Sequence, residues 1–336
     1  MRIETVTDFE DFKKLGKEWS FLLERSGSET VFLRHEWFSS WWEAFGEGRG
    51  LFILAGREGR GNLVGLAPLM NTGGRLFFMA NEEVTDYCDF IVDEKDREEY
   101  FSCFFHHLKG RSRLSPPLTL INMREASPNR ALFSAQAQAH GLRCLSEEVE
   151  VAPILDLPEG YDEYLESLRR KDRHELRRKL RRLNGIEGLK VFRIKQAEKM
   201  PETVGRFISL HKKTVGGKRR FWEKEGMERF FRSLASRLSD KGRVEFWAAS
   251  AGEKWIAVLM VFSESETVYF YNMAYDPEFA EYSPGFTLFN EAIRQAIVQK
   301  KKSVDFLRGS ERYKYYFGAR NSRIYRMTIK PEEDRG

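Results

Sequence analysis

The feature that most limits the fold of this chain is an order of elements that occurs twice, about 190 residues apart. Two segments with apolar residues at helical spacing, followed by two strand-like runs around a turn, appear first at residues 8–25, 35–45 and 51–70. The same order of helix, helix and hairpin returns at residues 201–213, 226–238 and 244–262. This repetition predicts a duplicated domain; a two-domain chain with unrelated halves is the alternative.

Strands and helices alternate after each hairpin, which favours an α/β fold with mixed (α+β) sheets over a helix bundle. A chain of 336 residues is long enough for two domains. We therefore expect an N-terminal domain over residues 1–160, a basic linker helix over 161–185 and a C-terminal domain over 186–336.

The cysteines and the hydropathy pattern restrict the class of protein. Cys88, Cys103 and Cys144 are odd in number and widely spaced, so neither a disulfide framework nor a metal site is expected. The N-terminal residues lack the apolar segment of a secretory signal, and no stretch reaches the roughly 18 apolar residues of a membrane span. These patterns predict a cytoplasmic protein without a transmembrane segment.

Basic residues are concentrated between Arg169 and Arg182, where nine Lys or Arg and two acidic residues give a net charge of +7 in a chain of net charge +5. Leucines on one stripe of this segment predict an amphipathic helix. Its arginines, among them Arg173, Arg177 and Arg181, would bind a polyanion: tRNA, a nucleotide-sugar diphosphate, acidic polysaccharide or an anionic lipid surface. Lipid binding would place the protein at the membrane periphery. A solvated helix between the two copies is the alternative.

The tripeptide Ser283, Pro284, Gly285 lies between a strand that ends at Tyr275 and a helix that begins near Phe286. Backbone N–H groups and the helix dipole converge at such a position, so it can hold the phosphate of a cofactor. We expect these five residues to form a cofactor-binding groove. An ordinary helix cap, with Ser283 as the capping residue, is the alternative.

Four further residues follow the next strand: Asp305 and Gly309 at the strand end, then Tyr313 and Lys314 on a short helix. Ligands often bind where strands of a mixed sheet end. Lys314, near several tyrosines, is a candidate for a lowered pKa or for phosphate binding. The alternative is that Lys314 reaches solvent along apolar neighbours while the tyrosines pack.

Three more residues are candidates for the acceptor side. Asp86 and Asp89 lie in one loop, and a carboxylate there could take a proton from an attacking amine. His211, on a predicted helix, is the histidine best placed for a site. Solvated loop acids and a packed helical histidine are the alternatives.

These motifs together resemble a known family. The runs YDPEFAEYSPGFTLFNEAIRQAI and DFLRGSERYKYYFGA, with FLRHEWFSSWWEAFG, LVGLAPLM and TDYCDFIV upstream, look like the CelD-like (cellulose-biosynthesis-type) acetyltransferases of the GNAT superfamily. More distantly, the chain is similar to the FemABX peptidoglycan aminoacyltransferases, whose two tandem GNAT domains would account for the repeat. The resemblance covers residues 5 to 330 or so and implies two tandem GNAT-like domains.

The resemblance implies an acyltransferase whose acyl-donor half is the C-terminal domain and whose N-terminal copy serves the acceptor. The small-residue Pro-Gly loop of the family falls on Ser283 to Gly285. Its catalytic positions fall on Asp305, Tyr313 and Lys314, and its strand-end glycine falls on Gly309. Single-domain relatives cradle the coenzyme A pyrophosphate with a richer glycine loop, which this chain lacks.

The sequence has no GxSxG elbow, Walker loop or metal-ligand spacing, which favours direct attack on the donor without a covalent enzyme intermediate. The strand 268–275 would polarise the donor carbonyl. Acyl-CoA is the expected co-substrate, with no tightly bound cofactor, and a sugar or glycan precursor of envelope or exopolysaccharide synthesis is the expected acceptor. Aminoacyl-tRNA is the alternative donor, and a non-catalytic polyanion-binding protein is the alternative class.

Overall fold

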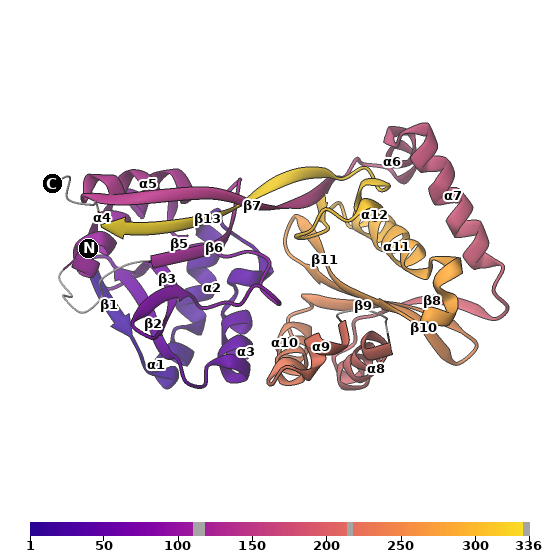
Figure 1. The fold of residues 1–336 in the computed structure, drawn as a ribbon, viewed down its shortest axis with the longest axis horizontal. Coiled ribbons are helices and arrows are strands. Elements are labelled where there is room, and N and C mark those ends of the chain that lie inside the picture. The colour runs from indigo at the N-terminus through magenta and orange to yellow at the C-terminus, as the bar shows by residue number, and fades with distance from the viewer. Residues whose placement is uncertain (110–117, 214–217, 332–336) are drawn as a thin grey trace. The chain divides into compact units, whose positions relative to one another are not determined.

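The computed structural model describes residues 1–109, 118–213 and 218–331 (Figure 1). By its internal contacts the chain divides into two compact units. Unit 1 comprises Met1–Glu150 and Ser322–Gly336, and unit 2 comprises Val151–Asn321. Both boundaries fall inside long strands, β7 (Leu142–Asp156) and β13 (Arg320–Pro331).

Unit 1 is a mixed sheet with the strand order β1-β2-β3-β4-β6-β13-β7, and β5 pairs with β3. Its other elements are β1 (Arg2–Val6), α1 (Phe9–Lys14), α2 (Gly16–Arg25), η1 (Val31–Leu33), α3 (His35–Phe45), β2 (Gly50–Arg57), β3 (Leu63–Thr72), β4 (Arg75–Phe78), β5 (Ile91–Val92), η2 (Glu94–Asp96), α4 (Arg97–Lys109), β6 (Leu118–Arg124) and α5 (Arg130–Ala139).

Most residues of β2 and β3 are buried irrespective of the face they occupy, so both faces of the unit 1 sheet are covered. Figure 1 shows α4 and α5 on one side and α1 to α3 on the other. Gly65 in β3 lies against the ring of Tyr100 from α4, where a Cβ atom would come within 2.2 Å of the ring. A glycine is therefore needed for α4 to pack this closely.

The first predicted helix, residues 8–25, is two helices. Asp8 caps the first, accepting hydrogen bonds from the N–H groups of Glu10 (2.8 Å) and Asp11 (3.1 Å). The helices meet at Leu15, and Gly16 then allows the His35 ring to approach to 3.1 Å from the position of a Cβ atom. The break between α1 and α2 at Leu15 allows α2 to pack against α3.

Unit 2 has its strands in the order β7-β12-β11-β10-β9-β8, in which β11 and β12 are parallel. Its elements are α6 (Tyr161–Ser167), α7 (Arg170–Asn184), β8 (Leu189–Ile194), η3 (Ala197–Lys199), α8 (Met200–Lys213), α9 (Lys218–Glu223), α10 (Met227–Ser239), β9 (Val244–Ala251), β10 (Lys254–Ser263), β11 (Thr267–Tyr275), η4 (Pro277–Tyr282), α11 (Pro284–Val298), β12 (Ser303–Asp305) and α12 (Arg312–Tyr315).

The apolar face of α11 forms the centre of the unit 2 core. Leu288, Phe289 and Ile293 of α11 are buried in one cluster with residues of β9, β10 and β11. The two expected copies of helix, helix and hairpin are both present, one in each unit, and the mixed sheets confirm the predicted fold class.

The units differ from the expected domain boundaries in two respects. The C-terminal strand β13 pairs with β6, from Ile324 with Arg124 to Ile329 with Leu118, and so belongs largely to unit 1. Residues 161–185 form two helices, α6 and α7, rather than one linker helix. They bury Tyr164, Leu176 and Leu183 in the unit 2 core because their apolar stripe faces that core.

Candidate active site

A pocket of about 180 Å³ lies at the start of α11 in unit 2. All five residues expected to bind a cofactor line it, together with the predicted catalytic residue Tyr313. The complete lining is Met273, Tyr275, Ala280, Ser283, Pro284, Gly285, Phe286, Phe289 and Tyr313. The structure thus brings together residues from the end of β11, the following loop, α11 and α12.

The turn into α11 has a distinctive backbone. Ser283 has φ +52° and ψ +53°, the left-handed conformation, and no side-chain hydrogen bond caps the helix from this residue. Pro284 occupies the first helical position, where its missing N–H is tolerated. Gly285 packs on β11, because a Cβ atom there would lie 2.7 Å from Cε of Met273. A side chain at this position would enter the pocket.

Strand β11 extends past the end of its parallel neighbour β12 toward this pocket. Its ladder with β12 pairs Thr267 with Ser303 through Tyr269 with Asp305, whereas β11 itself continues to Tyr275. The β10–β11 register shifts so that Tyr271 is an extra residue, a bulge. The pocket residues Met273 and Tyr275 follow this bulge, so the site occupies the segment of β11 beyond the parallel ladder.

On α12, Tyr313 and Lys314 have different environments. Tyr313 stacks on Phe289, with the ring centroids 5.3 Å apart, and burial raises the pKa of its hydroxyl. That hydroxyl therefore stays protonated at neutral pH and is able to donate a hydrogen bond within the pocket.

Lys314 is 2% exposed and lies away from the pocket lining. Its Nζ donates to the carbonyl oxygens of Leu307 (2.9 Å), Arg308 (2.8 Å) and Gly309 (3.0 Å). The carboxylate of Glu311 is also 2.9 Å from Nζ. Because an ammonium has three protons, these contacts engage all of its donors. Lys314 holds the 307–309 turn in this structure instead of facing a ligand.

Asp305 and Gly309 belong to the same turn. Asp305 is buried, and its Oδ1 accepts a hydrogen bond from the N–H of Leu307 (2.8 Å), whose φ is +60°. Gly309 has φ +108°, and its N–H donates to the carbonyl of Val151 (2.9 Å). Both residues shape the turn beside α12, and neither lines the pocket.

The candidate bases Asp86 and Asp89 lie in unit 1, whereas the pocket lies in unit 2. Asp86 is half-buried and Asp89 is buried. Oδ1 of Asp89 accepts hydrogen bonds from the N–H of Phe90 (2.8 Å) and from Nδ2 of Asn129 (3.0 Å), and burial raises the pKa of this carboxyl. Neither aspartate is among the residues that line the pocket at α11.

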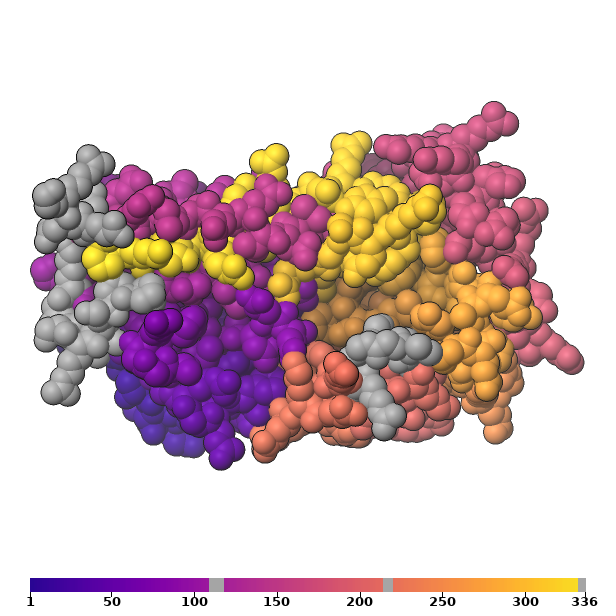
Figure 2. Space-filling model, in the orientation of Figure 1, coloured from indigo at the N-terminus to yellow at the C-terminus, as the bar shows by residue number. Residues whose placement is uncertain are grey.

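The basic helix α7 lies at the surface of unit 2 (Figure 2) and packs against α11 and η4. Arg173 donates from Nη1 to the carbonyls of Leu165 (3.2 Å) and Glu166 (3.4 Å), at the end of α6. Arg177 and Arg181 are exposed. Of the three expected polyanion-binding arginines, two therefore face solvent and one joins α7 to α6.

His211 is buried on α8 and separated from the pocket by β11. Trp222 donates from Nε1 to Nδ1 of His211 (3.0 Å), so the ring proton lies on Nε2, which donates to Oδ1 of Asn272 (3.1 Å). Successive strand residues point to opposite faces, so Asn272 faces away from the pocket residue Met273. This placement assigns His211 to the packing of α8 on the sheet.

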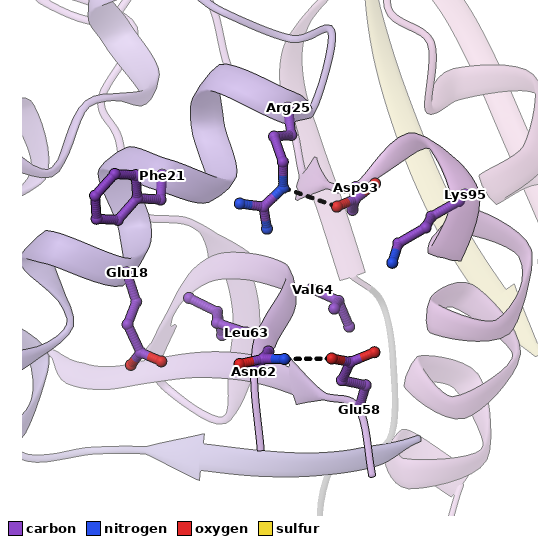
Figure 3. Close-up of a pocket in the computed structure, with 9 residues that line it drawn as sticks. All are labelled: Glu18, Phe21, Arg25, Glu58, Asn62, Leu63, Val64, Asp93 and Lys95. Carbon is purple, nitrogen blue, oxygen red and sulfur yellow. Dashed lines mark hydrogen bonds and ion pairs between the residues drawn. The ribbon is translucent and has the colours of Figure 1, made fainter. Parts of the chain in front are cut away.

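Unit 1 contains a larger and more polar pocket of about 580 Å³, shown in Figure 3. Arg25 pairs with Asp93 (Nε to Oδ2, 2.9 Å) across it, and Asn62 donates to Glu58 on the hairpin turn. Its lining consists of Glu18, Phe21, Arg25, Glu58, Asn62, Leu63, Val64, Asp93 and Lys95. None of these residues was expected from the sequence to form a site.

Lys179 is a residue of the unit 2 site that the sequence reasoning missed. Its Nζ donates to Oγ of Ser283 (3.1 Å) and lies 4.0 Å from the centroid of the Phe286 ring. The available signal was its place on α7, three residues after the buried Leu176, which puts both side chains on neighbouring positions of one helix face. The contact of that face with the pocket loop is a tertiary feature.

Comparison with known proteins agrees with this geometry. Residues 170–315 match the family model of the acetyltransferase (GNAT) domain. The matched segment lies within unit 2 and covers less than half of the chain. The matched GNAT segment runs from α7 through α12 and contains every residue that lines the pocket at α11. No curated protein matches the chain.

Among solved structures, FemX superposes with a TM-score of 0.63 at 14% identity, covering 98% of this chain and 97% of FemX. The L-PGS of Bacillus licheniformis gives 0.60 at 13% identity, covering 100% of this chain and 96% of that one. A tandem GNAT protein from the clavulanic acid biosynthesis pathway gives 0.52 at 12% identity, covering 99% of this chain and 100% of that one. These likenesses show that the fold is a two-domain GNAT-like architecture.

The match of residues 170–315 to the acetyltransferase (GNAT) domain supports an acyltransferase. Within residues 1–109, 118–213 and 218–331, no group of three or more His, Cys, Asp or Glu side chains is arranged to hold a metal ion. In the same part of the chain, no helix combines the length and apolar character needed to cross a bilayer.

Proposed function

We propose that the chain transfers an acyl group from acyl-CoA, bound in the pocket at the start of α11, to an amine or hydroxyl acceptor. The observation that carries this proposal is the convergence of Tyr275, the residues 283–286 and Tyr313 on one pocket of the GNAT domain. A pocket beside a strand end and a helix start can hold the pantetheine arm with the thioester carbonyl near β11.

The reaction proceeds by direct attack. The acceptor nitrogen or oxygen forms a bond to the thioester carbon, the C–S bond breaks, and the thiolate leaves with the bonding electrons. A carboxylate takes the proton of the acceptor, the role for which the sequence indicates Asp86 and Asp89 as candidates, and the sulfur is protonated as the thiol. Tyr313, whose buried hydroxyl remains protonated, is the candidate hydrogen-bond donor to the departing sulfur.

The acceptor proposed is a sugar or glycan precursor of envelope or exopolysaccharide synthesis in the cytoplasm. This part of the proposal rests on the resemblance of the sequence motifs to CelD-like acetyltransferases. The exposed arginines of α7 favour a second candidate, a FemABX-like transferase that takes its acyl group from aminoacyl-tRNA. The two candidates share the fold and differ in the donor.

The experiment is a thermal-shift titration of the full chain with acetyl-CoA, compared with the variants Gly285→Glu and Gly205→Glu. The glutamate side chain of Gly285→Glu would fill the pocket, since even a Cβ atom at this position meets Met273 at 2.7 Å. Gly205 on α8 has open space, with its nearest neighbour Arg232 at 4.0 Å, so it provides the same substitution away from the pocket. Acetyl-CoA should stabilise the wild type and Gly205→Glu, and not Gly285→Glu.

The proposal is wrong if no acyl-CoA stabilises the wild type. Consumption of aminoacyl-tRNA in that case would select the second candidate. Binding of nucleic acid that is lost with salt, without any acyl transfer, would instead indicate a polyanion-binding protein on a GNAT fold.

A further inference from the structure

One side chain of the basic helix reaches the acyl-donor pocket. Helix α7 lies alongside α11 (Figure 1), and Lys179 extends from it to Ser283 and Phe286, which both line the pocket. The Nζ–Oγ distance to Ser283 is 3.1 Å, and Nζ lies 4.0 Å from the Phe286 ring centroid. A cation is therefore fixed at the rim of an otherwise largely apolar pocket.

The ammonium group of Lys179 has hydrogen-bond donors that an anion could use. Its side chain is 17% exposed, and burial lowers the pKa of the amine, an effect that Glu175 opposes. Glu175 is 3.8 Å away, beyond hydrogen-bond distance. Within the described part of the chain, the hydrogen bond to Ser283 engages one of the three ammonium protons.

A second contact fixes α7 to the same loop. Arg182, nearly one turn after Lys179, pairs with Glu281 of η4 (Nη2 to Oε2, 2.9 Å). Two side chains of α7 thus contact the loop of residues 281–283 just before α11. This second contact restrains the position of Lys179 relative to the pocket.

The backbone of the turn itself offers few donors. The N–H of Ser283 is bonded to the carbonyl of Ala280 (3.1 Å), Pro284 has no N–H, and the N–H of Phe286 is bonded to the carbonyl of Ser283 (3.0 Å). Among these four consecutive residues, at most the N–H of Gly285 remains to meet a ligand. A backbone cradle of the glycine-rich kind is therefore not formed here.

We infer that Lys179 binds the pyrophosphate of acyl-CoA at the pocket rim, supplying with a side chain the positive charge that this backbone turn does not provide. The inference rests on the proposed function, because it assigns a phosphate-bearing donor to the same pocket. An anion at Nζ would replace or share the Ser283 contact, and the Phe286 ring below the ammonium would remain in place. Lys179 is a donor-binding residue, distinct from the groups proposed for proton transfer.

The test compares Lys179→Gln with Lys171→Gln, which removes the same charge from an exposed position of the same helix. Calorimetric titration uses two ligands, coenzyme A and pantetheine, which lacks phosphate. Lys179→Gln should weaken coenzyme A binding about tenfold or more, the effect of losing one charge-assisted hydrogen bond, and leave pantetheine binding unchanged. Lys171→Gln should bind both ligands as the wild type does, and Lys179→Arg should recover part of the lost affinity.

Kinetic measurement gives an independent readout. Lys179→Gln should raise KM for acetyl-CoA with little change in kcat, because the pyrophosphate is bound equally in the ground state and the transition state. Melting temperatures without ligand identify any variant that is merely unfolded.

Two results would overturn the inference, and they are distinguishable. Wild-type affinity for coenzyme A in Lys179→Gln would remove Lys179 from the site while leaving the proposed function standing. Failure of the wild type to bind coenzyme A at all would overturn both.

Discussion

At the scale of single residues, the buried ammonium of Lys314 donates hydrogen bonds to the carbonyls of one turn. Replacement by methionine would keep most of the apolar contacts and leave three carbonyl oxygens, of Leu307, Arg308 and Gly309, without this donor. We expect the free energy of unfolding of unit 2, measured in urea, to fall by about 3 kcal/mol. Glu311→Gln, which alters an exposed carboxylate, should cost less than about 1 kcal/mol.

A catalytic role for Lys314 predicts a different pattern. If Lys314→Met retained wild-type stability and lost acyl transfer, the turn-holding role would be wrong and the sequence-based prediction of a catalytic lysine would stand.

Asp89 provides a test with a defined pH dependence. Burial raises the pKa of the folded carboxyl above its ordinary value of 3.8, so the folded state holds the proton more tightly than the unfolded chain does. Ionisation therefore destabilises the fold progressively as pH rises above 3.8. Asp89→Asn should raise the free energy of unfolding at pH 7, measured in urea, by about 1 kcal/mol. The substitution removes a buried charged oxygen, Oδ2, that lacks a hydrogen-bond partner among the described residues.

The extra stability of Asp89→Asn should shrink as pH falls toward the ordinary value of 3.8. It should approach zero only well below that pH, where the carboxyl is protonated in both states. Urea titrations of both proteins at several pH values measure it. A difference that does not change with pH would contradict a raised pKa. Loss of acyl transfer in this stable variant, with activity kept in Asp86→Asn, would identify Asp89 as the proton acceptor.

Local sequence patterns bring the residues of the pocket loop together, whereas their partners come from distant parts of the chain. Ser283 to Phe286 were expected together because a small-residue turn directly before a helix is a local pattern. Lys314 was expected to meet a ligand from its position in a motif, but the direction of its Nζ depends on where the 307–309 turn folds back. Lys179 could not be distinguished from the other basic residues of its segment, since only the packing of α7 on α11 brings it to Ser283.

At the scale of elements, helix α7 is strongly charged and yet contributes buried leucines to the unit 2 core. Leu176 is fully buried among residues of unit 2, so Leu176→Ala should cost about 2–4 kcal/mol in urea unfolding. Lys171→Ala, at an exposed position of the same helix, should change stability by less than about 0.5 kcal/mol. A Leu176→Ala cost as small as that of Lys171→Ala would restore the description of residues 161–185 as a solvated linker.

The elements that the sequence predicted are those with local signals. Both hairpins and the helix His35–Phe45 follow from turn residues and apolar periodicity. Strand β7 was not expected, because its sequence LRCLSEEVEVAPILD combines an acidic exposed half with a buried half and lacks regular alternation. Its existence depends on long-range pairing, as in Ser303 with Asp156, which no local pattern specifies.

At the scale of the whole molecule, the two ends of the chain contribute to one unit. Strand β13 fills unit 1 with Ile324, Met327 and Ile329, all 2% exposed or less, and pairs with β6. A division of the chain at residue 160 could not include this strand, because a sequence read in order assigns its last strand to its last domain. The fold of unit 1 therefore depends on residues that follow unit 2.

This dependence predicts the effect of ending the chain at Asn321. Unit 1 would lose three core side chains and the partner of β6, leaving a sheet edge and a cavity that together exceed the few kcal/mol by which a domain is stable. Hydrogen exchange measured by mass spectrometry should show amide protection in α3 and β2 falling roughly tenfold or more, while α11 in unit 2 keeps its protection. A chain ending at Pro331 retains β13 and serves as the control. Unchanged protection in α3 after truncation at Asn321 would mean that unit 1 is stable without β13, and that the boundary near residue 160 describes an independent domain after all.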